Sequence, residues 1–134
     1  MKKLAAFMVS LVLAGCSMAN ANDGFKGRTY RLLKAPNDAR ITIAFDANEP
    51  RFAGLAAVNR YFGSYGFDSA GRLELSPAGT TMMMGPMPLM EAEQEYLKIL
   101  PTVSGFELKG QTLILKTSGG QDLLFIETMP DADN

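Results

Sequence analysis

The sequence lacks histidine and tryptophan altogether, and it has a single cysteine, Cys16, among 134 residues. Without histidine, a Ser-His-Asp triad, a Cys-His dyad and every His-ligated zinc or iron site are excluded. The 13 basic and 14 acidic side chains give a net charge of −1, so the overall charge does not predict binding to nucleic acid. The apolar run at residues 4–13 is too short for a membrane-spanning helix, which needs about 20 residues.

The N-terminus has the pattern of a bacterial lipoprotein signal. Lys2 and Lys3 precede the apolar run, and residues 13–16 read Leu-Ala-Gly-Cys, which matches the lipobox. We therefore expect residues 1–15 to be a signal peptide and Cys16 to carry the acyl chains that anchor the protein to a membrane. Ser17, where inner-membrane lipoproteins have Asp, favours the outer membrane, facing the periplasm. An ordinary secretory signal that contains a cysteine is the alternative, and either signal takes the protein out of the cytoplasm.

The remaining chain divides into three segments. Residues 16–27 are the lipidated cysteine and a small, polar, aperiodic tether, residues 28–128 form one folded domain, and residues 129–134 are a polar tail. Within the domain, apolar and polar residues alternate with a period of two, which is typical of strands. The expected strands are residues 29–34, 40–45, 51–58, 61–67, 72–75, 106–109, 111–117 and 122–128.

One segment has a helical period instead. Residues 88–100 place Leu89, Ala92, Tyr96, Ile99 and Leu100 on one stripe, with three glutamates early in the helix. A proline suits the first helical turn, and another follows the last residue. We therefore expect a mainly β fold, in which a small closed or nearly closed antiparallel barrel carries a single helix at one end.

The chain resembles the META/HslJ domain family of small bacterial envelope proteins. The resemblance rests on residues 52–65 (FAGLAAVNRYFGSY), 79–85 (GTTMMMG), the helical segment with Glu91 and Tyr96-Leu97, 103–115 (VSGFELKGQTLIL) and 123–125 (LLF), in the family's order and spacing. It implies a lipoprotein that contributes to stress or antibiotic tolerance, since a familiar member is linked to heat shock and novobiocin resistance. Two cysteines of the family pattern fall on Val58 and Gly85 here, so the disulfide they would form is absent and stability must come from core packing.

A first candidate site is the segment that contains Asn59, Arg60, Tyr61, Tyr65 and Phe67. If its aromatic residues share one strand face, they could line a cavity for a ligand or a contact surface for a partner. The alternative is that they fill the barrel, because small barrels are usually packed with side chains.

A second candidate is the run of five methionines within residues 82–90. Met84, Met87 and Met90 are spaced by three, and thioethers are ligands for Cu(I). The competing interpretation is that these methionines fill irregular gaps in the core beside the helix.

Together these features favour a binding module over an enzyme, with no cofactor. Lipidation would remove Cys16 as a nucleophile, and no pair of carboxylates is placed as a general acid and base. We expect a membrane anchor and a partner that is an envelope protein or a small amphiphile. A pilotin-like assembly partner of a secretion or outer-membrane machine is the first alternative, and periplasmic Cu(I) binding is the second.

Overall fold

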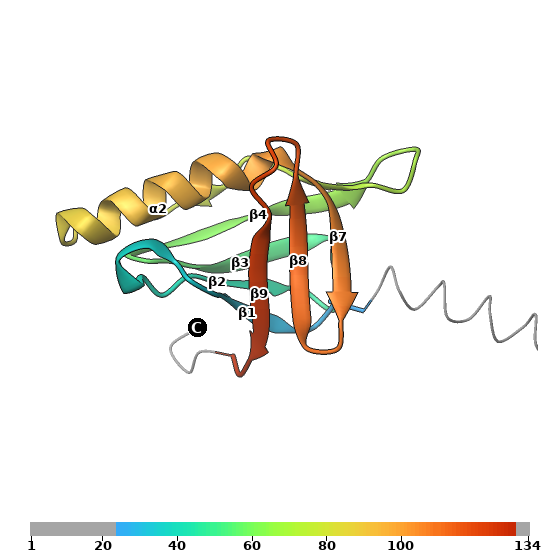
Figure 1. The fold of residues 1–134 in the computed structure, drawn as a ribbon, viewed down its shortest axis with the longest axis horizontal. Helices are drawn as coiled ribbons and strands as arrows, with labels where there is room; N and C mark the ends of the chain where they lie inside the picture. The colour runs from blue at the N-terminus through green and yellow to red at the C-terminus, as the bar shows by residue number, and fades with distance from the viewer. Residues whose placement is uncertain (1–23, 131–134) are drawn as a thin grey trace, which may run out of the picture.

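The computed structural model describes residues 24–130 and contains nine strands and one α-helix in that range. The strands are β1 (Thr29–Leu32), β2 (Thr42–Phe45), β3 (Arg51–Ala56), β4 (Asn59–Phe67), β5 (Leu73–Leu75), β6 (Gly79–Thr80), β7 (Val103–Lys109), β8 (Thr112–Thr117) and β9 (Leu123–Thr128). The helices are α2 (Met87–Ile99) and two 3-10 turns, η1 (Pro36–Asp38) and η2 (Leu100–Thr102). Figure 1 shows the strands wrapped around a common interior, with α2 lying over one end.

The strands form one antiparallel sheet in the order β5-β4-β3-β2-β1-β9-β8-β7, and β6 adds to β4. The two ends of this order, β5 and β7, contact each other without pairing, so the barrel is nearly closed. This confirms the fold class expected from the period-two segments and the single helical segment. The two-residue strand β6 was not predicted, because it is too short to show an alternation.

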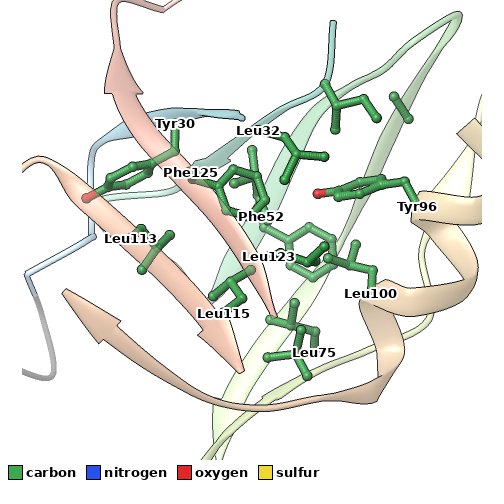
Figure 2. Packing of buried hydrophobic residues seen from close by; sticks show 14 of the residues in the cluster. Tyr30, Leu32, Phe52, Leu75, Tyr96, Leu100, Leu113, Leu115, Leu123 and Phe125 are labelled. Atoms are coloured by element: carbon green, nitrogen blue, oxygen red, sulfur yellow. The ribbon is translucent and has the colours of Figure 1, made fainter. Parts of the chain in front are cut away.

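The barrel interior holds a continuous apolar core. Figure 2 shows Leu113 and Leu115 from β8, Phe125 from β9 and Tyr96 from α2 pointing into the same space. The largest completely buried side chains are Tyr30, Tyr61, Phe25, Phe45, Phe52 and Phe125. Aromatic and aliphatic residues therefore supply the core, and no methionine among residues 24–130 belongs to it.

Helix α2 begins and ends within one residue of the predicted segment. Pro86 and Pro88 flank its first residue, Met87, and Pro101 lies in the η2 turn that follows it. Ala92, Tyr96 and Leu100 of the predicted stripe are buried, whereas Leu89 and Ile99 are partly exposed. None of the described helices is long and apolar enough to cross a membrane.

The packed domain extends further towards the N-terminus than residue 28. Phe25, which falls within the expected tether, is completely buried, and its ring lies 4.5 Å from Phe45 and 5.0 Å from Phe106. The expected signal peptide, Cys16 and most of the expected tether lie outside the described residues, as do residues 131–134 of the expected tail.

Candidate functional site

Strand β4 carries the first predicted site, and most of its side chains are engaged inside the fold. Tyr61 is 1% exposed and packs against Phe52. Tyr65 packs against Phe25 and Phe45, with ring centroids 5.5 and 5.6 Å away. These rings therefore fill the barrel. Of the five predicted residues, Arg60 and Phe67 are the two whose side chains reach the surface, Arg60 in part and Phe67 with 39% exposure.

The hydroxyl of Tyr61 joins the helix to the barrel wall. It donates to the Thr42 carbonyl oxygen at 2.7 Å and accepts from the Tyr96 hydroxyl, whose oxygen is 2.6 Å away. Tyr61 is assigned as the donor to Thr42 because a carbonyl oxygen can only accept. Burial raises the pKa of Tyr61 well above its ordinary value, and the neighbouring Tyr96 raises it further. Both hydroxyls thus serve as neutral hydrogen-bonding groups of the core.

Asn59 is the centre of a buried polar network that sequence reasoning missed in part. Its amide nitrogen donates to Glu93 Oε2 of α2 at 2.7 Å and to the Met83 carbonyl at 3.2 Å. Its amide oxygen accepts from the Met83 backbone N–H at 2.6 Å and from the Thr81 hydroxyl at 2.9 Å. All four hydrogen-bonding positions of the amide are therefore used, and Asn59 holds the backbone at Met83 in place.

Glu93 is the partner that the sequence analysis did not single out. The side chain is 5% exposed, and Oε1 accepts from the backbone N–H groups of Val58 and Asn59 at 3.1 and 2.7 Å. Glu93 was expected only as one of three glutamates early in the helix, and the structure shows that it differs from Glu91 and Glu95 in being buried. The available signal was its spacing: Glu93 lies three residues before Tyr96 and seven before Leu100, on the buried stripe.

The methionines gather on the surface where α2 begins. Met82, Met84 and Met87 are 93%, 88% and 68% exposed, Met83 is 53% exposed, and Met90 is half-buried. We call these five residues the methionine patch. The interpretation of the run as filler of core gaps does not hold for Met82, Met84 and Met87, because their side chains face solvent.

A groove of about 750 Å³ begins at the methionine patch and runs along α2. Met84, Met87 and Met90 all line it, so the structure brings together the three methionines that the spacing singled out. Further along the helix, Ile99 and Gln121 line both this groove and an adjoining one of about 390 Å³ that reaches Leu124. Glutamates and one lysine border the first groove: Glu91, Glu95 and Lys98.

The two positions where the family pattern has cysteines lie in contact beside the patch. A Cβ atom placed on Gly85 would be 3.5 Å from the Val58 Cβ, within the spacing of a disulfide-linked pair. In this chain the Val58 methyl groups occupy the space, since one of them would lie 2.8 Å from that Cβ. Packing therefore replaces a covalent link between the β3–β4 turn and the start of α2.

Metal binding through the usual side chains has no support within residues 24–130. No group of three or more His, Cys, Asp or Glu side chains in that range is placed to hold a metal ion. This finding does not concern a thioether site for Cu(I), because the ligands of such a site would be methionine sulfur atoms.

Comparison with solved structures shows the same fold. A protein from Burkholderia xenovorans, solved by NMR, matches with a TM-score of 0.67 at 20% identity over 81% of this chain and 87% of its own. A DUF4847 family protein from Bacteroides vulgatus matches with a TM-score of 0.56 at 12% identity over 80% of this chain and 96% of its own. At these identities the likeness concerns the fold alone.

The sequence comparison identifies the family. No curated protein matches the sequence. The family model of the META domain matches residues 23–130, which include every residue that the structure describes. The resemblance read from residues 52–65, 79–85, 103–115 and 123–125 is thereby confirmed. The chain belongs to the META domain family.

Proposed function

We propose that this protein is a non-enzymatic, lipid-anchored protein of the cell envelope that binds a partner protein through the methionine patch. In this role it supports envelope integrity under stress or antibiotic exposure. Membership of the META family and the lipobox at residues 13–16 support the envelope role. The observation that carries the binding proposal is the exposure of Met82, Met84 and Met87, of which Met84 and Met87 line the groove along α2.

The anchor in this proposal is Cys16, which would hold the domain at the outer membrane on the periplasmic side. Two or more acyl chains are needed for stable attachment, because a single chain binds reversibly. Radiolabelled palmitate should enter the wild-type protein and not a Cys16→Ser variant. Equal labelling of the two proteins would overturn the anchor.

Exposed methionines need an explanation, because methionine is among the residues most often buried in proteins. Here the six methionines of residues 24–130 all lie outside the buried core, and five of them are in the patch. The thioether side chain is apolar, unbranched and flexible, which suits a surface that must adapt to a binding partner. The Asn59 network fixes the backbone beneath the patch, so these side chains can adapt without losing their position.

The occupant that fits the groove best is an amphipathic helix with basic residues. Its apolar face would lie on the thioethers and Ile99, in the manner of helix-in-groove recognition. Glu91 and Glu95 border the groove and form no ion pair within residues 24–130, so they are available to basic side chains. Helix α2 has 13 residues and is about 20 Å long, which matches a partner helix of about the same length.

A synthetic peptide tests this binding mode. The probe is a helical peptide of about 14 residues with leucines at helical spacing and lysines on the other face, and its counterpart has glutamates instead of lysines. We expect the full chain to bind the lysine peptide and to bind the glutamate peptide at least about tenfold more weakly, measured by fluorescence anisotropy. A Met82→Gln/Met84→Gln/Met87→Gln variant should lose at least about tenfold in affinity for the lysine peptide.

Met129→Gln is the matched control, because Met129 is 81% exposed and lies outside the patch. It should leave the affinity unchanged. Binding of both peptides with equal affinity would point to an uncharged amphiphile as the occupant. Unchanged binding by the triple variant would remove the patch from the proposal.

Two alternatives give different results. A pilotin-like assembly partner requires one dominant membrane-protein partner in cells, whereas an envelope binding protein need not have one.

Cu(I) binding is favoured by one observation, which is that Met84, Met87 and Met90 line the same groove. Titration with Cu(I) tests the copper alternative. If the wild-type protein binds Cu(I) no more tightly than a Met82→Leu/Met87→Leu/Met90→Leu variant does, the copper alternative is wrong.

A further inference from the structure

Side chains that oxidants attack are distributed very unevenly over this domain. The chain has no histidine and no tryptophan, and its single cysteine lies outside residues 24–130. The four tyrosines are all buried, with exposures between 0% and 7%. Accessible and readily oxidised groups in the described part of the chain are therefore methionine thioethers, and most of them are in the methionine patch.

The core, by contrast, contains no sulfur. Its members are Phe, Tyr, Leu, Ile, Val and Ala side chains. Methionine sulfoxide usually damages a protein by placing a polar group in the core or in a methionine-rich interface. In this domain oxidation can affect only a methionine-rich interface, because oxygen added to the exposed thioethers leaves the packing of the barrel unchanged.

We propose that the methionine patch is a site of oxidation by hydrogen peroxide, and that oxidation there switches off binding of the amphipathic partner helix. In the peroxide reaction a sulfur lone pair attacks one peroxide oxygen, and an S–O bond forms as the O–O bond breaks. The sulfur loses two electrons, the peroxide is reduced, and the leaving oxygen departs as water. The product is a polar sulfoxide at the mouth of the groove.

The consequence for binding follows from the place of these side chains. Met84, Met87 and Met90 line the groove along α2. Sulfoxide oxygens at Met84 and Met87 must lose water when an apolar face covers them, and this loss costs free energy because an apolar face offers no donor in its place. The loss of binding rests on the proposed function, whereas the pattern of oxidation depends only on exposure and on the composition of the core.

The first measurement maps the oxidation. The full chain is treated with increasing hydrogen peroxide, and its peptides are analysed by mass spectrometry. We expect Met82, Met84, Met87 and Met129 to gain oxygen first, with Met83 and Met90 later and no tyrosine modified. The melting temperature should stay within about 3 °C of the untreated value. Early oxidation of Met90, or a larger fall in melting temperature, would overturn the separation between an oxidisable surface and a sulfur-free core.

The second measurement follows binding of the lysine peptide before and after oxidation. The oxidised wild type should bind at least about tenfold more weakly. A Met82→Leu/Met84→Leu/Met87→Leu variant keeps the three most exposed positions of the patch apolar and removes their sulfur atoms, and it should retain most of its affinity after the same treatment. Undiminished binding by the oxidised wild type overturns the switch and leaves the proposed function standing. Failure of the untreated chain to bind overturns both, and the oxidation map alone remains.

Discussion

Replacing Gly54 by alanine is expected to lower the free energy of unfolding by at least about 3 kcal/mol. A Cβ atom at this position would lie 2.1 Å from the Thr42 carbonyl oxygen and 2.8 Å from its carbonyl carbon. Both atoms belong to the backbone of β2, so relief requires movement of a whole strand. Chemical denaturation of the full chain, followed by circular dichroism, measures the loss.

The close approach at Gly54 has a structural reason. The Leu55 N–H donates to the Thr42 side-chain oxygen at 3.1 Å, and the Thr42 carbonyl instead accepts from the Tyr61 hydroxyl. The glycine therefore lets β2 and β3 approach each other where Thr42 leaves the regular pattern of sheet bonding. Gly66→Ala is the control, because nothing lies within 4 Å of its added Cβ and Gly66 has an ordinary φ. A loss of similar size from both substitutions would mean that strand flexibility, and not the contact with Thr42, decides the effect.

Glu93→Ala is expected to cost about 3–5 kcal/mol of stability. The substitution removes the acceptor from three donors: the backbone N–H groups of Val58 and Asn59 and the side-chain amide of Asn59. Each buried donor that loses its acceptor costs about 1–3 kcal/mol. The two Asn59 bonds are buried, whereas the Val58 N–H is part-buried and keeps the Ala56 carbonyl oxygen as an acceptor at 2.7 Å. Thermal and chemical unfolding of the full chain would report the loss.

Glu91 and Glu95 provide the matched controls on the same helix. Both are exposed, and alanine at either position should change stability by no more than about 0.5 kcal/mol. Because Asn59 also holds Met83, the Glu93 variant should in addition lose affinity for the lysine peptide under conditions where it is still folded. Equal effects of Glu91→Ala and Glu93→Ala would contradict the buried network.

The fold could be predicted well from the sequence because its signals are local. Ile43, Phe45 and the other alternating residues mark strands, and the spacing from Ala92 to Leu100 marks the helix, so both the barrel and the helix ends were foreseen. The closure of the barrel at β5 and β7 follows from the number of short strands. The burial of Phe25 could not be predicted, because the residues around it show no periodicity. Its position depends on packing against Phe45 and Phe106, which lie far away in the sequence.

The site was harder to predict because it depends on contacts between distant segments. Asn59 was singled out as a residue that could bind a ligand, yet its partners Glu93, Met83 and Thr81 come from the helix and the preceding loop. The local sequence also does not indicate that the methionines are exposed, since an apolar run beside a helix is equally compatible with a position in the core. Composition was more informative than pattern here: the lack of Cys, His and Trp in the domain is what makes its surface methionines chemically distinctive.

Site-specific photocrosslinking in living cells tests the methionine patch as a binding surface most directly. A photoreactive residue at position 84 samples the patch, and one at position 109 samples the β7–β8 turn, where the Lys109 side chain is 74% exposed. We expect position 84 to give a discrete product whose crosslinked segment is an amphipathic helix with basic residues, and position 109 to give none. Products of equal yield from both positions, or none from position 84, would contradict the proposed binding surface.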